Sequence, residues 1–316
     1  MGALPGCAAV VGGVNIDIGG VSRGKLVTGD SNPGAVRFSL GGVGRNIAHN
    51  LSLLGVDVRL LTALGEDVWA SRIEGSCALL GIDLKGSLIV PGASTSAYLY
   101  IAGPDGDMAL AVSDMDIYAH LTPAALEPRL DWLRQARAVV LDANLPAETI
   151  NWLCDRIDAP LFADPVSAAK AGRFLGALGR LHTLKPNRLE AELLSGVKIR
   201  DEESLYRAAD ALLKTGLRRV YISLGADGIL AAEGDRRLRF GAARGTHVNT
   251  TGCGDAFLAA LVWAQLQGLG LKDSARAGIA AAGIAMADPE TVSPRMSAEA
   301  LRATMREESR TSGGTI

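Results

Sequence analysis

Short apolar runs of strand length alternate with helical patterns along most of this 316-residue chain. The runs fall at residues 8–14, 58–64, 138–142, 161–164, 182–185 and 220–224, and helical patterns lie at 44–54, 68–80, 146–157, 188–194 and 203–214. This alternation predicts an α/β fold with helices on both faces of a central, mostly parallel sheet. Ligands of such sheets bind beyond the carboxyl ends of the strands, so we expect the functional residues there.

Two turn-rich stretches, residues 17–39 and 84–112, interrupt the alternation. The first holds five glycines, and the second has turn sequences at Pro91-Gly92 and at residues 103–106. We predict that both form hairpins of a small second β-sheet that serves as a lid, within a single domain spanning residues 1–316. A lid excludes water from a reaction in which water is a competing acceptor. The alternative is that the hairpins are peripheral decorations.

Composition narrows the classes of partner. The net charge of −2 gives no electrostatic reason to expect nucleic-acid or membrane binding. The four cysteines are far apart and lack the spacing of metal ligands, which favours reduced thiols and a cytoplasmic location. No apolar run reaches membrane-spanning length, and the apolar N-terminus has no basic flank typical of a signal peptide.

The segment Thr-Thr-Gly-Cys-Gly-Asp-Ala-Phe at residues 250–257 carries the most chemical information. Gly252, Cys253 and Gly254 form a turn that leads directly into a helical pattern, and the amino end of a helix favours an anion. Asp255 in the first turn is placed to accept a proton from a hydroxyl beside that anion. Phosphoryl transfer needs both features. Alone, the motif favours the explanation that the acid complements the helix dipole.

Two motifs near the amino end are candidates for binding a sugar. Asn15 and Asp17 follow the first strand, and alternate residues of an extended chain point the same way. Gly41 and Gly42 open a Gly-Gly-x-Gly-x-Asn motif whose Asn46 lies in the first turns of the next helix. Turn chemistry is the alternative explanation for the first motif.

Two further motifs suit a nucleotide. Asn187 and Glu190 lie three residues apart at a helix start, where they form a capping box or hold a hydrated Mg²⁺. Ser223, Gly225 and Gly228 form a glycine turn at a strand end, which suits nucleotide contacts or an ordinary hairpin. Each motif alone favours the structural explanation.

In combination and in this order, the motifs resemble the ribokinase-like (PfkB) carbohydrate kinases over roughly residues 8–305. The resemblance implies the ribokinase-like fold and transfer of a phosphoryl group from ATP, with Mg²⁺, to a primary hydroxyl of a sugar or nucleoside. It assigns the base to Asp255 and the anion hole to Gly252, Cys253 and Gly254. The remaining assignments are Asn15, Asp17, Gly42 and Asn46 for the acceptor, Asn187 and Glu190 for magnesium and phosphates, and Ser223, Gly225 and Gly228 for the nucleotide. Members of the family often need K⁺ near the anion hole, and many form dimers through their lids.

Several segments are more similar to the pseudouridine kinases of that family, among them residues 30–34, 41–48, 113–117 and 182–192. This resemblance implies the 5′-hydroxyl of pseudouridine as the acceptor. A polar lid residue such as Asp30 is a candidate for hydrogen bonding to the base edge. A kinase for ribose, fructose or a purine nucleoside such as adenosine remains an alternative, as does a nucleoside sensor that does not catalyse.

Overall fold

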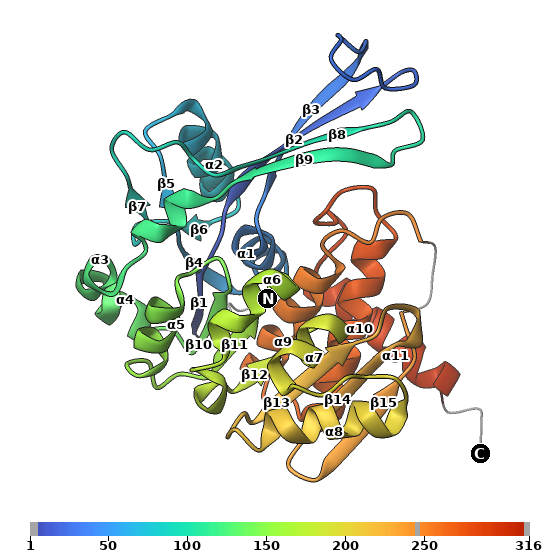
Figure 1. The fold of residues 1–316 in the computed structure, drawn as a ribbon. Helices are drawn as coiled ribbons and strands as arrows, with labels where there is room; N and C mark the ends of the chain where they lie inside the picture. Colours follow the sequence, from blue (N-terminus) through green and yellow to red (C-terminus); the bar gives the residue numbers. More distant parts are fainter. Residues whose placement is uncertain (1–5, 244–246, 313–316) are drawn as a thin grey trace.

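The computed structural model describes residues 6–243 and 247–312 of the chain. Its largest element is a nine-stranded sheet with strand order β15-β14-β13-β12-β11-β10-β1-β4-β6 (Figure 1). The strands from β13 across to β6 pair in parallel. The strand bounds are β1 Cys7–Val11, β4 Asp57–Leu61, β6 Ile82–Asp83, β10 Ala138–Asp142, β11 Leu161–Asp164, β12 Thr183–Leu184, β13 Arg219–Ser223, β14 Ile229–Glu233 and β15 Arg236–Phe240. The expected mostly parallel α/β sheet is confirmed.

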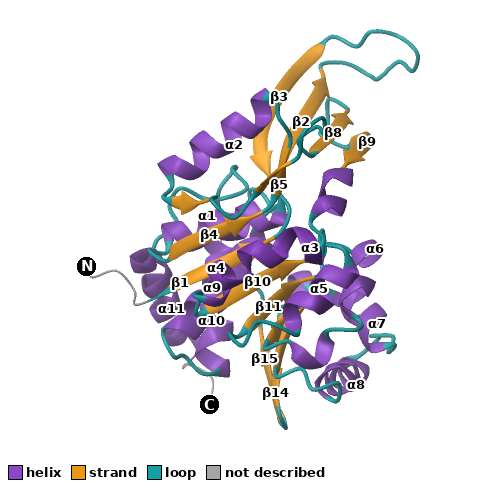
Figure 2. Cartoon of the chain, turned by 90° about the vertical axis from the view of Figure 1, so that its left-hand side faces the viewer, coloured by secondary structure: helices purple, strands orange, loops and turns teal. Residues whose placement is uncertain are grey.

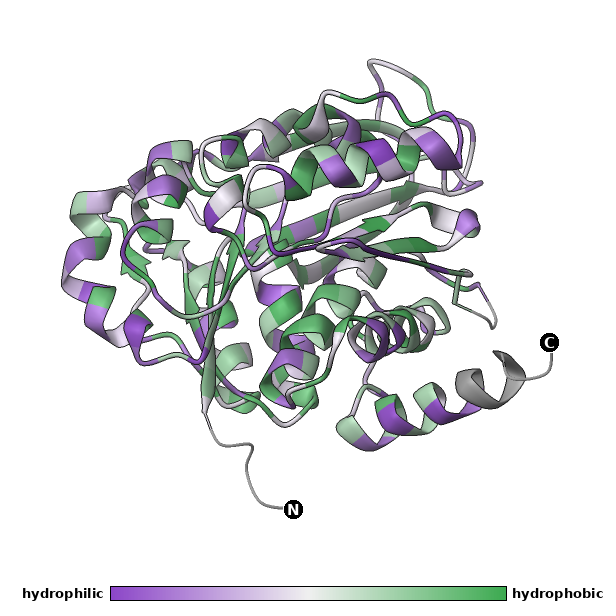
Figure 3. Ribbon diagram, turned by 90° about the horizontal axis from the view of Figure 1, so that it is seen from below, coloured by the Kyte–Doolittle hydropathy of each residue, from purple (hydrophilic) through white to green (hydrophobic). Residues whose placement is uncertain are grey.

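Helices cover both faces of this sheet (Figure 2). Successive side chains of a strand point to opposite faces, so Ala8 and Val10 of β1 enter one apolar cluster while Ala9 and Val11 enter the other. The first cluster is covered by α1 Val43–Leu53, α2 Val68–Leu79, α9 Cys253–Leu266, α10 Leu271–Met286 and α11 Ala298–Ser312. The second is covered by α3 Pro123–Leu126, α4 Leu130–Arg134, α5 Ala147–Cys154, α6 Ala168–Ala171, α7 Arg188–Ser195 and α8 Glu202–Leu213. Figure 3 shows the apolar strands between helices of mixed polarity.

The strand β13 begins an antiparallel extension of the sheet. It turns at residues 224–228 into β14, which pairs in turn with β15. The edge strand β15 has the sequence Arg-Arg-Leu-Arg-Phe, and charged side chains on an edge oppose pairing with another sheet. The extension therefore places a glycine turn at the carboxyl end of β13, and its charged edge strand disfavours pairing with the sheet of another molecule.

A separate four-stranded sheet has the order β3-β2-β8-β9, with β2 Asn15–Ser22, β3 Gly34–Gly41, β8 Ala97–Ala102 and β9 Met108–Asp114. This is the small second sheet expected from the sequence, and it projects from the body above the main sheet (Figure 1). One boundary of the predicted second sheet differs from the structure. Residues 84–96 were expected in this sheet, but β7 Leu88–Ile89 pairs with β5 Ala63–Leu64 because this segment runs beside the end of β4.

The two faces of the small sheet differ in chemistry. Asp17 lies across from Ser39 and Tyr98 on one face. On the other face Ile18 lies between Phe38 and Leu99, and Leu99 lies beside Val112. Phe38 and Val112 are 52% and 58% exposed, so this second face presents apolar side chains to solvent. We call it the apolar lid face.

None of the helices in the described part of the chain combines the length and the apolarity that a membrane-spanning segment needs.

Candidate active site

The first turn of α9 carries the proposed base. Gly252 caps the helix with φ 82°, a conformation that glycine adopts without strain, and a Cβ there would lie 2.0 Å from the carbonyl oxygen of Thr291. Asp255 is the third residue of the helix. The helix then runs apolar on all sides into the core, from Ala256 to Ala264. The sharp glycine turn and the buried helix together fix where the carboxylate points.

The start of α1 meets the start of α9. Asn46 Nδ2 donates a hydrogen bond of 2.9 Å to Asp255 Oδ2, across 209 residues of sequence. The helix α1 reaches this position because Gly42 and Gly44 pack directly against the backbone of Gly13. The structure therefore brings together the acceptor motif and the proposed base, which the sequence predicted only through a resemblance.

Asn15 and Asp17 lie on β2, whose first pair is with the end of β3. Asn15 Nδ2 donates to Asp17 Oδ1 at 2.6 Å, and the two side chains therefore form one polar unit. Gly41 lies beside them, and a Cβ there would lie 2.1 Å from Asp17 Oδ2. Burial raises the pKa of Asp17, against the hydrogen bond from Asn15 and the charge of Arg45.

The groups around Asp255 act on the pKa of its carboxyl in opposite directions. Desolvation, helped by the carboxylates of Asp164 and Asp142, raises its pKa to about 7. The Asn46 hydrogen bond and the Lys185 ammonium act in the opposite direction. A general base is most effective when its pKa lies near the working pH, so this value suits proton abstraction from an alcohol.

Lys185 is a site residue to which sequence reasoning gave no role. Its Nζ lies 3.1 Å from Asp164 Oδ2, and a Cβ on Gly254 would lie 3.0 Å from the same Nζ. Burial opposes its charge, but Asp164, Glu190 and Asp255 together raise its pKa. The sequence does hold a signal for this residue. The strands β10 and β11 end on Asp142 and Asp164, and Lys185 directly follows β12. Three neighbouring strands of the sheet therefore end at a charged residue.

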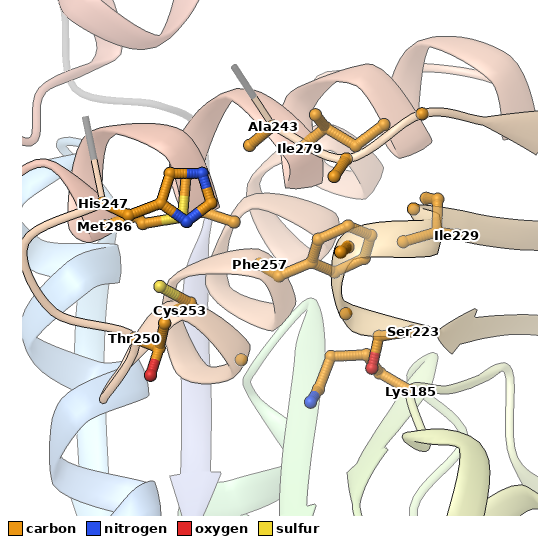
Figure 4. A pocket seen from close by; sticks show the side chains of 17 residues that line it. Lys185, Ser223, Ile229, Ala243, His247, Thr250, Cys253, Phe257, Ile279 and Met286 are labelled. Carbon is orange, nitrogen blue, oxygen red and sulfur yellow. The ribbon is translucent and has the colours of Figure 1, made fainter. Parts of the chain in front are cut away.

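A cavity of about 380 Å³ opens beside the first turn of α9 (Figure 4). Lys185 and Ser223 lie at one end, and Phe257, Ile229 and Ile279 line the apolar remainder. Among the predicted residues, Ser223, Gly225, Gly228, Cys253 and Gly254 all line it. A cationic and hydrogen-bonding end joined to an apolar chamber matches the polyphosphate and base of a nucleotide.

Asn187 and Glu190 form the capping box that the sequence allowed. The Asn187 side chain accepts from the Glu190 backbone N–H, and Glu190 Oε2 accepts from the Asn187 backbone N–H at 2.8 Å. Asn187 also pairs with Ser223, which ties this cap to the glycine turn. Burial raises the pKa of Glu190. Among the described residues, no group of three or more His, Cys, Asp or Glu side chains forms a direct metal cluster.

Asp30 is the one candidate that the structure does not bring to the others. It lies in the loop at the free end of the β2–β3 hairpin, while Asn15 and Gly41 pair at the opposite end (Figure 1). Seven strand steps separate Asn15 from Ser22, which corresponds to roughly 23 Å. The Asp30 carboxylate accepts from the neighbouring Ser31 N–H. Within one chain the extended hairpin therefore keeps Asp30 away from Asn15 and Gly41.

Comparison with known proteins identifies the family of this chain. The pfkB family of carbohydrate kinases matches residues 8–298. The chain belongs to the pfkB family. It is 37% identical over 290 residues to the pseudouridine kinase of Escherichia coli strain K12, covering 91% of this chain and 93% of that one. It is also 37% identical over 292 residues to an uncharacterized sugar kinase, YeiI, of the same strain, covering 92% of this chain and 81% of YeiI.

The solved structure of Arabidopsis thaliana ribokinase complexed with ribose and ATP superposes with a TM-score of 0.82 at 20% identity. The match covers 95% of this chain and 99% of the ribokinase, which confirms the ribokinase-like fold. This pfkB kinase is therefore a phosphotransferase with an alcohol group as acceptor, acting on a small sugar or nucleoside, and kinases of this fold use ATP with Mg²⁺.

Proposed function

We propose that this pfkB kinase transfers the γ-phosphoryl group of ATP to the 5′-hydroxyl of pseudouridine. The contact between Asn46 and Asp255 is the observation that carries the proposal, because it joins an acceptor motif to a base with a pKa of about 7. The similarity to the E. coli pseudouridine kinase over nine-tenths of both chains supports the choice of acceptor.

The acceptor binds between the small sheet and the start of α1. Asn15 and Asp17 present an amide and a carboxylate on the polar face of the small sheet, where they bind neighbouring ribose hydroxyls. Gly42 lets the backbone approach, and Asn46 offers a buried Oδ1 that has no hydrogen-bond partner within the described chain. The 5′-hydroxyl then lies against Asp255, which removes its proton as the oxygen attacks phosphorus.

The nucleotide binds in the cavity beside α9. Its base occupies the apolar chamber around Phe257, and its phosphates extend toward Lys185 and the N–H groups of Cys253 and Gly254. Donors already in place stabilise the charge that develops during transfer without reorganising. Lys185 is held for this task by its ion pair with Asp164.

The donor set near Lys185 fits a hydrated Mg²⁺. Asp164, Glu190 and Asp255 provide more negative charge than the one ammonium group neutralises, and magnesium prefers oxygen ligands while keeping several of its waters. Glu190 is the residue that would hold the ion through water. When bound, Mg²⁺ neutralises charge on the phosphates. A requirement for K⁺ near the anion hole belongs to the same proposal, on the family resemblance alone.

An ADP-release assay across pseudouridine, uridine, cytidine, adenosine, ribose and fructose tests the proposal. We expect pseudouridine to give the highest kcat/KM, and Asp255→Asn to lower turnover by about 10²–10⁴-fold on every acceptor. A clear preference for uridine or a free sugar would reject pseudouridine as the substrate and leave the kinase assignment intact.

A second candidate acceptor is another sugar or nucleoside. The equal identity to YeiI favours it, as does 28% identity over 293 residues to the guanosine-inosine kinase of Exiguobacterium acetylicum. The same assay separates the two candidates.

We also propose that two copies of the chain associate through the apolar lid face. Val36, Phe38, Leu99, Leu110 and Val112 lie on this face and are 38–64% exposed. A contiguous apolar patch of this kind on a monomer marks an interaction site. In a C2 dimer the same patch of both partners is buried, so the apolar lid face of one copy packs against the apolar lid face of the other.

Sedimentation velocity tests the dimer. We expect the parent protein to sediment as a dimer and Leu99→Lys/Val112→Lys as a monomer. Leu79→Lys is the matched control, since Leu79 is 91% exposed on α2, outside the apolar lid face. A monomeric parent, or a double variant that remains dimeric, would contradict this interface.

A further inference from the structure

A buried guanidinium group lies at the root of the small sheet, the end at which β3 returns to α1. Arg45, in the first turn of α1, is 6% exposed. Its Nη1 donates to the Leu40 carbonyl oxygen of β3 and its Nη2 donates to Ser76 Oγ of α2, both at 3.0 Å. Its backbone N–H donates to the Gly13 carbonyl oxygen at 3.2 Å. One residue therefore ties α1 to β3, to α2 and to the link between β1 and β2.

The strand β3 receives this donor at the edge of its sheet. The order β3-β2-β8-β9 leaves one side of β3 without a neighbouring strand. Backbone groups on such a side have no partner in the ladder. At Leu40, one residue before β3 ends, the Arg45 guanidinium supplies a hydrogen bond from α1 instead. This bond holds the root of the small sheet against the start of α1.

The charge of Arg45 has a counterpart on the polar face of the small sheet. Both side-chain hydrogen bonds go to neutral groups, and a buried cation without a counter-charge is costly. Burial lowers the pKa of Arg45, and Cys77 and the Asp17 carboxylate oppose this change. Asp17 Oδ2 lies against Gly41, since a Cβ on Gly41 would be 2.1 Å from that oxygen. The guanidinium and the carboxylate thus both lie beside the Leu40–Gly41 peptide.

We propose that Arg45 is a positioning residue for the acceptor: its guanidinium fixes the Leu40–Gly41 peptide at the root of the small sheet and faces Asp17 with the opposite charge. The inference rests on the proposed function, in which Asp17 binds a ribose hydroxyl. Arg45 acts through these groups and not by contact with the acceptor. It sets the place of the polar face, which holds the ribose, relative to the start of α1, which reaches the base.

Steady-state kinetics, with the acceptor that the ADP-release assay ranks first, tests this role. Arg45→Met keeps the aliphatic stem but removes the donors and the charge, so we expect the acceptor KM to rise by about 10-fold or more. The kcat at saturating acceptor and the KM for ATP should each change by less than about threefold, because the lost interaction serves binding of the acceptor. Arg45→Lys keeps the charge without the planar fork and should recover part of the loss. Arg156→Met is the matched control: this guanidinium lies over Trp152, beyond the end of α5, and its removal should leave all three constants unchanged.

Two results would overturn the inference. One is an acceptor KM that stays at the parent value in Arg45→Met, and the other is an equal loss in kcat and in both KM values. If Arg45→Met does not fold, Arg45→Lys decides by the same criterion, since a single ammonium group cannot reproduce the bidentate fork. Its acceptor KM must then rise while the KM for ATP does not.

Amide hydrogen exchange measures the anchor without turnover. In Arg45→Met, or in Arg45→Lys if only that variant folds, we expect faster exchange in β3 than in the parent, with β10 equally protected in both proteins. Equal exchange of β3 in variant and parent would refute the anchor. If the parent phosphorylates no acceptor, the proposed function fails, while the exchange rates still judge whether Arg45 holds the root of the small sheet.

Discussion

Replacing Asp255 by Asn should make the protein a much slower enzyme and a more stable protein at the same time. Loss of a positioned base typically lowers turnover by about 10²–10⁴-fold. The stability gain follows from the environment of the carboxylate. Desolvation and the neighbouring carboxylates raise its pKa from 3.8 to about 7, so keeping it ionised in the folded state costs free energy.

The structure sets the size of that cost. A displacement from 3.8 to about 7 corresponds to about 4 kcal/mol, at about 1.4 kcal/mol per unit. Part of the gain is offset in the variant, because buried Lys185 loses one of the three carboxylates that stabilise its charge. We therefore expect Asp255→Asn to raise the free energy of unfolding by about 1–3 kcal/mol at pH 8.

The pH dependence of the gain is the sharper test. Between about pH 4 and pH 7 the folded parent binds more protons at this group than the unfolded chain does, so its stability falls as the pH rises. Urea unfolding of both proteins at pH 5, 6, 7 and 8 should show the gap widening up to about pH 7 and then remaining constant. A variant less stable than the parent at pH 8, or a gap independent of pH, would refute the reasoning.

Three further substitutions separate roles within the site. Cys253→Ala should keep activity near that of the parent in the ADP-release assay, because the proposed anion contact uses its backbone N–H; a large loss would assign a role to the thiol. Lys185→Met should lower kcat by about 10²–10³-fold with a smaller change in nucleotide KM, since the ammonium group acts on the developing charge; a change in KM alone would make it a ground-state contact. Glu190→Gln keeps a side chain able to cap α7 but removes the charge, so the Mg²⁺ concentration for half-maximal rate should rise while the melting temperature stays near that of the parent; an unchanged Mg²⁺ requirement would leave Glu190 as a cap only.

Local pattern was sufficient to predict the main sheet. The runs at 138–142 and 161–164 match β10 and β11 in full, because buried parallel strands are uniformly apolar and end abruptly at a charged residue. The segment 84–96 was misplaced for the opposite reason. Its strand β7 has only two residues, and which partner so short a strand pairs with depends on the path of the chain.

Candidate site residues could be predicted from the sequence where the backbone conformation itself requires a particular residue type. Gly42 and Gly252 both need a positive φ, and both open helices that carry site residues. Lys185 was missed because a lysine after a strand has no pattern of its own, and its role depends on Asp164 from the neighbouring strand. The distance of Asp30 from Asn15 could not be predicted, because the length of the hairpin is visible only once the strand pairing is known.

The balance of charges around Asp255 explains why this one carboxylate has several polar and charged neighbours. A lone Asp255 in this desolvated position would stay protonated at neutral pH and could not take a proton from an alcohol. A carboxylate fully neutralised by lysine would have a low pKa and would be a poor base. Asp142 and Asp164 act in one direction, and Lys185 and Asn46 in the other, so that the pKa settles at about 7. Because the four come from β10, β11, the end of β12 and α1, we expect the proposed base to reach this pKa only when the whole α/β body has folded around it.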